Sequence, residues 1–281
     1  MGNKKIIALF NNKGGVSKTT TTYNLGWMLS LMGKKILIVD SDPQCNLTGI
    51  CINSTKENKL EDLYKSDLSN IKSSIEPVFS GDPEPIKAAN CVEFKGNDNL
   101  FLLPGHIQFS SYDTTYNIAE TMTGSLNLMK NVPGALRRML ELTAEKYSLD
   151  IILIDMSPSI SATNANILMQ SDYFIVPCAP DYFCYMAIES LVSIFPKWCE
   201  TYKKMALNEI FQSATYKMKD KPPVFLGTIQ QRYRPRNGSP ARAFADWIAD
   251  INNLVADKLI PVLTANDMFC ESGDKGSYEE P

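Results

Sequence analysis

The stretch NNKGGVSKTTTTYNLG, residues 11–26, follows the apolar run IIALF at residues 6–10 and begins what the pattern predicts to be a helix. Gly14 and Gly15 remove side-chain bulk where a strand turns, so that successive backbone N–H groups can point inward around an anion. The N-terminal end of the following helix then directs its partial positive charge toward the same anion. These features predict an anion-binding loop between a strand and a helix.

Two side chains in this loop favour the phosphates of a nucleotide as the anion. Lys18 supplies a cation that can reach terminal phosphates, and the Thr19 hydroxyl is placed to ligate Mg²⁺, as in a P-loop. The alternative is a glycine-rich turn before an amphipathic helix, because Lys and Thr are also common solvated residues. The order of strand, Gly-Gly, Lys-Thr and helix favours a nucleoside triphosphate site.

Carboxylates suited to such a site follow two other apolar runs. KKILIVDSDPQCN at residues 34–46 contains Asp40 and Asp42, and LDIILIDMSPS at residues 149–159 contains Asp155. Apolar runs rich in β-branched residues suit parallel central strands, and an Asp at the carboxyl end of such a strand faces the ligand crevice of an open α/β sheet. Each Asp alone could equally cap a turn. Together with the loop, they favour a metal–nucleotide site.

The alternation of apolar runs along the chain predicts an α/β fold with a mostly parallel central sheet and helices on both faces. Strands are expected near residues 5–10, 35–39, 100–103, 151–154, 173–176 and 224–229. Helices are expected near residues 18–32, 125–147, 161–169, 185–207 and 240–256. We expect a single domain over residues 1–281, with a peripheral insertion at 53–99 that carries one or two short helices and an acidic tail at 268–281.

In five segments the chain resembles the ParA/MinD family of deviant Walker A P-loop ATPases. The matching segments are KGGVSKTT (13–20), VDSDPQCN (39–46), LLPG (102–105), IILIDMSPS (151–159) and YFIVPCAPDYFCYMAIESL (173–191). They occur in order over most of the chain, and the Asp-x-Asp-Pro-Gln element favours the ParA-like branch. Two positions depart from the family pattern: Ser17 stands where glycine is usual, and Ser157 stands where a second proline is common.

The resemblance implies a weak ATPase with ATP and Mg²⁺ as cofactors. The nucleotide contacts that it implies are Lys13, Gly14, Gly15, Val16, Ser17, Lys18, Thr19 and Thr20, with Gln231 and Arg232 as weaker candidates beside the adenine. The catalytic residues that it implies are Lys13, Lys18 and Asp42, and the metal site comprises Thr19, Asp42 and Asp155. In this family Lys13 reaches across a homodimer interface to the other subunit's phosphates, and Asp42 orients the attacking water.

Basic residues are concentrated in one part of the chain, although the net charge is only −3. Residues 197–242 carry ten Lys or Arg against three acids, whereas residues 243–281 carry two against eight. The densest basic stretch contains Arg232, Arg234, Arg236 and Arg242. ParA-like proteins bind DNA nonspecifically through basic residues of this half, and arginines suit phosphate contacts. Solvated loop charges are the alternative, and the acidic tail would oppose a broad basic face.

Several classes of protein are disfavoured by composition. The seven cysteines include no Cys-x-x-Cys pair, which argues against a zinc knuckle or a disulfide framework and fits a reducing cytoplasm. No apolar run reaches 18 residues, and the chain begins a strand within five residues instead of a signal peptide. The acidic stretch ESGDKGSYEEP at residues 271–281 is not a basic amphipathic helix. We therefore expect a cytoplasmic protein without membrane contact.

Two functions fit these features. The first is an ATP-dependent partitioning protein that closes as a sandwich dimer on DNA and is released when an unidentified partner protein stimulates hydrolysis. The second is a nucleotide-gated regulator or adaptor that recruits a partner protein in a plasmid, phage or mobile-element system without a role in DNA partitioning. A salt-sensitive, ATP-dependent DNA shift would favour the first.

Overall fold

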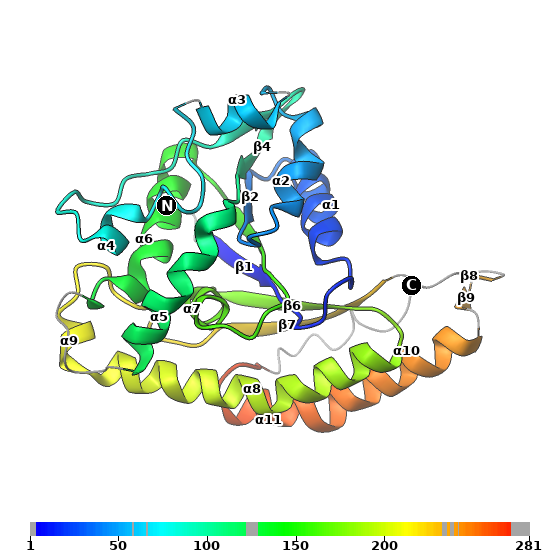
Figure 1. Ribbon diagram of the computed structural model, residues 1–281. Helices are drawn as coiled ribbons and strands as arrows, with labels where there is room; N and C mark the ends of the chain where they lie inside the picture. Colours follow the sequence, from blue (N-terminus) through cyan, green and yellow to red (C-terminus); the bar gives the residue numbers. More distant parts are fainter. Residues whose placement is uncertain are drawn as a thin grey trace.

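A sheet of seven strands in the order β3-β4-β2-β5-β1-β6-β7 runs through the middle of the molecule (Figure 1). The computed structural model describes residues 4–57, 59–65, 67–121, 129–231, 235–236, 239–240 and 242–270. The strands are β1 (Lys5–Leu9), β2 (Ile36–Asp40), β3 (Val92–Phe94), β4 (Asn97–Leu103), β5 (Ile151–Asp155), β6 (Tyr173–Cys178) and β7 (Val224–Gln230). Every neighbouring pair is parallel except β3 and β4, so the predicted fold class is confirmed.

Helices alternate with these strands along the chain. They are α1 (Lys18–Leu31), α2 (Asn46–Cys51), α3 (Leu60–Lys65), α4 (Glu76–Ser80), α5 (Tyr112–Thr121), α6 (Val132–Tyr147), α7 (Ala162–Gln170), α8 (Tyr182–Leu207), α9 (Glu209–Gln212), α10 (Arg242–Leu254) and α11 (Ile260–Ala265). Short 3₁₀ turns are η1 (Ile52–Ser54) and η2 (Ile107–Ser111), a π-helical turn η4 (Val255–Leu259) joins α10 to α11, and β8 (Pro235–Arg236) pairs with β9 (Ser239–Pro240).

The sheet separates two hydrophobic cores. Within β2, Ile36 and Ile38 belong to the core beneath α1 and α2, whereas Leu37 and Val39 belong to the core that α5 to α8, α10 and α11 cover. Because successive side chains of a strand point to opposite faces, a strand buried on both faces must be apolar throughout. A Cβ on Gly26 would lie 2.6 Å from Ile38 Cγ2, so α1 can approach β2 only because this residue is glycine.

The six predicted strands and four of the predicted helices lie close to their predicted positions. Helix α8 begins earlier than expected because the Asp181 carboxylate caps it, accepting from the Cys184 N–H at 2.9 Å. Helix α6 begins at Val132, where Pro133 fits the first turn, although a helix was expected from residue 125; residues 122–128 lie outside the described ranges. The sequence did not predict the edge strand β3, the helices α2, α5 and α11, or the short α9.

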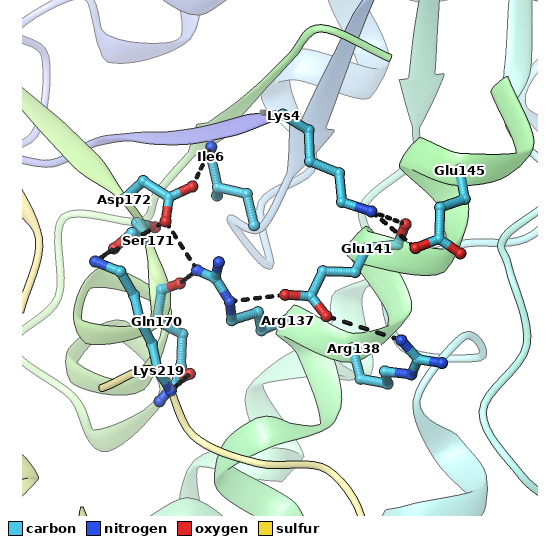
Figure 2. Close-up of polar contacts among 10 residues, drawn as sticks. All are labelled: Lys4, Ile6, Arg137, Arg138, Glu141, Glu145, Gln170, Ser171, Asp172 and Lys219. Atoms are coloured by element: carbon cyan, nitrogen blue, oxygen red, sulfur yellow. Dashed lines mark hydrogen bonds and ion pairs between the residues drawn. The ribbon is translucent and has the colours of Figure 1, made fainter. Parts of the chain in front are cut away.

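A polar network ties the amino ends of β1 and β6 to helix α6 (Figure 2). Asp172 accepts from the Ile6 N–H at 2.9 Å and from the Arg137 guanidinium at 3.1 Å. Arg137 also donates to the Gln170 carbonyl at 2.6 Å, and the Lys219 ammonium lies 3.9 Å from Asp172. This edge of the sheet is thus stabilised by charges that have partners.

Among the residues that the structure describes, none of the helices combines the length and the apolar character needed to cross a membrane.

Candidate nucleotide-binding site

The predicted loop residues and carboxylates lie at the carboxyl edge of the sheet. Strand β5 lies between β1 and β2, with Asp155 in register with Leu9 on one side and with Asp40 on the other. The loop that follows β1 and the carboxylates that end β2 and β5 are therefore neighbours. The open α/β sheet places its ligand crevice at this edge.

The loop between β1 and α1 adopts the conformation that an anion cradle requires. Gly15 has a φ of 73°, and Ser17 has a φ of 62° and a ψ of 28°, so both residues are left-handed. A Cβ on Gly14 would meet no atom within 4 Å, which leaves the outer side of the loop open. Left-handed residues among right-handed ones turn successive N–H groups toward one concavity. The departure from the family pattern at Ser17 thus falls at a position where only glycine is free of strain.

Lys18 is buried inside this loop. Its ammonium donates to the Asn11 carbonyl at 2.9 Å and to the Lys13 carbonyl at 3.0 Å. Burial lowers the pKa of Lys18 to about 8, and the carboxylates of Asp155 and Asp42 partly offset this effect. A cation held by loop carbonyls at this position is suited to meet a triphosphate that enters the cradle.

Asp155 is almost fully buried, and neither of its carboxylate oxygens has a hydrogen-bond partner among the described residues. Burial raises the pKa of Asp155 to about 7. The Thr19 hydroxyl lies beside the carboxylate and lowers this pKa, although its geometry falls short of a full hydrogen bond. Two unpartnered oxygens next to a hydroxyl fit a Mg²⁺ ion or its bound water, because hard cations prefer oxygen ligands.

The two carboxylates that follow β2 have different surroundings. Asp42 accepts from the Gln44 N–H at 2.9 Å and lies close enough to Lys18 to affect its pKa. Asp40 is fully buried and accepts from the N–H and hydroxyl of Thr48 at 2.8 and 2.6 Å. Burial raises the pKa of Asp40 to about 6 despite these bonds. Asp42 therefore remains the candidate for contact with water or metal, and Asp40 has a structural role.

The LLPG segment, residues 102–105, packs against the carboxylate of Asp40. The Gly105 N–H donates to the Thr48 hydroxyl at 2.9 Å, and a Cβ on Gly105 would lie 2.9 Å from Asp40 Cγ. The second departure from the family pattern, Ser157, is accommodated by Asn164, whose side-chain amide donates to the Ser157 hydroxyl and carbonyl, each at 3.0 Å.

The Lys13 side chain has different partners from that of Lys18. Its N–H donates to the Asn11 side chain at 2.9 Å, and its ammonium contacts both carboxylate oxygens of Asp181, at 2.8 and 2.5 Å. Asp181 lies within the matching segment at residues 173–191, and the sequence alone assigns it no role. An Asp directly before an apolar helical run is a recognisable N-cap signal; its pairing with Lys13 is a tertiary contact that no local pattern reveals.

The predicted base contacts are only partly described. The Gln231 N–H donates to the Cys178 carbonyl at 2.8 Å, and its side-chain amide contacts the Thr21 hydroxyl on α1. Gln231 thus lies beside the helix that begins at the loop. Arg232 and Arg234 fall outside the described residues, and of Arg236 and Arg242 the structure gives only backbone positions, in β8 and at the start of α10.

Comparisons with known proteins agree with this geometry. A family model described as an AAA domain matches residues 4–208, well over half of the chain. The sporulation initiation inhibitor protein Soj of Bacillus subtilis is 28% identical over 190 residues, which cover 67% of this chain and 64% of that protein. The chain thus spans slightly less than two thirds of that relative. The chromosome partitioning protein ParA of Caulobacter vibrioides is 28% identical over 258 residues, which cover 92% of this chain and 80% of that protein.

A solved structure shares the fold. Cobyrinic acid a,c-diamide synthase from Mycobacterium smegmatis, with bound ADP and magnesium, matches with a TM-score of 0.60 at 22% identity over 89% of this chain and 82% of that chain. The fold, the left-handed residues of the loop between β1 and α1, and the family match together show that the chain belongs to the ParA/MinD family of P-loop ATPases.

Proposed function

We propose that this chain is an ATP-dependent switch that binds Mg-ATP, closes face to face as a homodimer, and reopens after slow hydrolysis. The observation that carries the proposal is the division between two lysines. Lys18 is buried and turned into its own loop, whereas the Lys13 ammonium lies outside that loop, against Asp181. A cation outside its own loop does not serve its own subunit's phosphates, which suits it to a second subunit's nucleotide.

The roles of the site residues follow from their positions. The loop N–H groups and Lys18 would bind and orient the phosphates, and Thr19, Asp155 and Asp42 would hold the metal directly or through its water. When bound, Mg²⁺ neutralises charge on the phosphates. Asp42 orients the attacking water, since its carboxylate lies at the open edge beside Lys18. Positioning and electrostatic stabilisation, with little covalent chemistry by the protein, account for hydrolysis of this type.

The surroundings of the site support a face-to-face contact. Large apolar side chains are exposed on segments that follow the carboxyl ends of β4, β5 and β6. They are Ile107, Ile160, Tyr182, Phe183 and Met186, with exposed fractions between 47% and 72%. Exposed apolar patches are typical of association surfaces. A second copy of the chain is the occupant that the Lys13 geometry favours.

The output of the switch is DNA partitioning, in which the closed dimer loads on DNA and a partner protein stimulates its release. Relatives named as partitioning proteins support this output. The four arginines between residues 232 and 242 supply the phosphate contacts, with Arg232 shared with the adenine pocket. The expected location is the cytoplasm.

Lys13→Ala tests the switch. The variant should keep most of its Mg-ATP affinity by calorimetry, remain monomeric with ATP by light scattering, and lose hydrolysis and ATP-dependent DNA binding. Lys34→Ala, which removes an exposed lysine from the loop after α1, is the matched control and should behave like the parent. A full ATP-dependent dimer of Lys13→Ala would refute the crossing role. An ATP-dependent dimer of the parent that leaves DNA unshifted at low salt would favour the adaptor function.

A further inference from the structure

The Lys13 ammonium is held by its own subunit. It contacts both carboxylate oxygens of Asp181, at 2.8 and 2.5 Å, and the two side chains are 22% and 42% exposed. Burial alone would raise the pKa of Asp181, but the Lys13 ammonium and the Cys184 N–H hold it below its usual range. Asp181 is therefore charged at neutral pH, and the pair is a charged one.

The Lys13–Asp181 pair competes with the contact that the proposed function gives Lys13 at the second subunit's nucleotide. A lysine that lies along the N-terminus of α8 in its own subunit is not extended toward a second nucleotide. From this geometry we propose that Asp181 is a positioning residue that retains Lys13 in the nucleotide-free subunit and must release it before the dimer closes. The inference rests on the proposed function and adds to it an internal threshold for dimerisation.

The exposure of the two side chains sets the size of the effect. A partly exposed ion pair of this kind stabilises its closed form by a factor of about 1.4 to 5. Two such pairs open for each dimer formed, so the dimerisation constant changes by the square of this factor, about 2- to 25-fold. A contact of this strength raises the protein concentration needed for ATP-dependent dimerisation, but it is too weak to prevent dimerisation.

Asp181 also caps α8, and the variants must separate its two roles. Asp181→Asn keeps a side-chain oxygen that can accept from the Cys184 N–H but removes the charge that holds Lys13. Asp181→Glu keeps the charge on a longer side chain. Glu189→Gln is the matched control: it removes a carboxylate from the same helix, where Glu189 pairs with Lys258 at 2.9 Å and not with Lys13.

The first measurement is the reactivity of Lys13 in the nucleotide-free chain. An amine-reactive ester labels lysines, and mass spectrometry follows the Lys13 peptide. Asp181→Asn should raise the labelling rate of Lys13 by about 2- to 5-fold. Asp181→Glu should restore a rate near that of the parent, and Glu189→Gln should leave it unchanged. An unchanged rate in Asp181→Asn would overturn the proposal, because Lys13 would then not be retained.

The second measurement is the protein concentration at half-dimerisation with a slowly hydrolysed ATP analogue and Mg²⁺. Asp181→Asn should lower it by about 2- to 25-fold, at unchanged nucleotide affinity, and the double variant with Lys13→Ala should stay monomeric. If the parent remains monomeric with the analogue and Mg²⁺, the proposed function itself is wrong. A parent that dimerises together with an Asp181→Asn variant that needs the same or more protein would overturn only the role of Asp181.

Discussion

Carboxylates at the two edges of the sheet have opposite surroundings. At the amino edge, Asp172 accepts from a backbone N–H and from the Arg137 guanidinium, and Lys219 lies nearby (Figure 2). At the carboxyl edge, neither oxygen of Asp155 has a hydrogen-bond partner among the described residues, and burial raises its pKa to about 7. One edge contains charges with partners, and the other contains a charge that lacks one.

This difference suggests that the carboxyl edge is less stable than it could be because its residues are arranged for binding. A buried carboxylate without a partner costs free energy, whereas partners offset part of the desolvation cost of a paired one. Backbone strain at Ser17 occurs at the same edge as the unpartnered Asp155. Backbone strain and unpaired charge occur often at functional sites, because a bound ligand supplies the interactions that these groups lack in the free protein. The carboxyl edge is therefore where we expect an anion and a cation to bind together.

The largest effect is expected from Lys18→Ala. Mg-ATP affinity should fall by about 100-fold or more, because the terminal phosphates lose their buried cation. Calorimetry measures the affinity. Lys219→Ala is the matched control, since burial lowers the pKa of Lys219 to about 8 as well, but at the amino edge. The control should bind Mg-ATP like the parent. If both variants bind alike, the assignment of the loop to phosphate is wrong.

Asp172→Asn should be the most destabilising of the carboxylate variants. Removing its charge takes one of the two carboxylate partners from the Arg137 guanidinium in a partly buried network, with Glu141 as the one that remains, at a cost of about 1.5–3 kcal/mol of unfolding free energy. Urea unfolding of the nucleotide-free chain measures the loss, and Mg-ATP affinity should be retained. A loss below about 0.5 kcal/mol would mean that the network behaves like exposed surface pairs.

The same substitution at the other edge, Asp155→Asn, should change the free energy of unfolding in the opposite direction. A neutral amide removes the buried charge, so the nucleotide-free chain should gain about 1–2 kcal/mol at pH 7. Because the pKa is raised on folding, the folded parent binds more protons than the unfolded chain between about pH 4 and pH 7. The parent therefore loses stability as the pH rises through this window, and the variant does not lose this contribution.

Urea unfolding at pH 4, 5.5 and 7 tests this sign. The gain of Asp155→Asn over the parent should be small at pH 4, grow toward pH 7 and then level off. Asp40 also has a raised pKa, and its charge adds to the rise in the pKa of Asp155. The stabilisation that added Mg-ATP confers should be smaller in the variant. A gain that does not vary with pH would show that Asp155 is not neutralised on folding.

Much of the fold and of the loop followed from local signals in the sequence. The apolar runs that end in Asp40 and Asp155 predicted central strands and placed both residues at one edge, as the register confirms. The strand β3 escaped prediction because Val92–Phe94 is short and is stabilised by antiparallel pairing with β4 instead of by its own pattern. Whether residues 1–281 form a single domain stays a prediction.

The contacts of individual side chains were harder to predict. Asp181 lies 168 residues from Lys13 in the chain, and their pairing depends on β6 lying beside β1 in the sheet. The same holds for Gln231, which reaches α1 only after β7 joins the edge of the sheet. The roles of the loop residues, Asp42 and Asp155 in catalysis and metal binding remain predictions, as do the DNA contacts of Arg234, Arg236 and Arg242.

The smallest effect is expected from Ser17→Gly, and it separates strain at the two edges. Ser17 and Ser148 are both left-handed, with φ of 62° and 55°, but Ser148 ends α6 at the amino edge, before β5. Replacing either residue with glycine removes about 1–2 kcal/mol of strain and adds about 0.5–1 kcal/mol of unfolded-chain entropy. Each variant should therefore gain about 0.5–1 kcal/mol in urea unfolding.

Valine at the same two positions completes this test, because a β-branched residue tolerates the left-handed region poorly. Both valine variants should lose stability, but only Ser17→Val should also lose Mg-ATP affinity, since only there does the strained backbone form the phosphate cradle. Ser17→Gly should bind Mg-ATP within about three-fold of the parent, because its N–H groups keep their direction. A ten-fold loss in Ser17→Gly would instead show that the Ser17 hydroxyl donates to a phosphate, and that the serine at this position is retained for binding despite its strain.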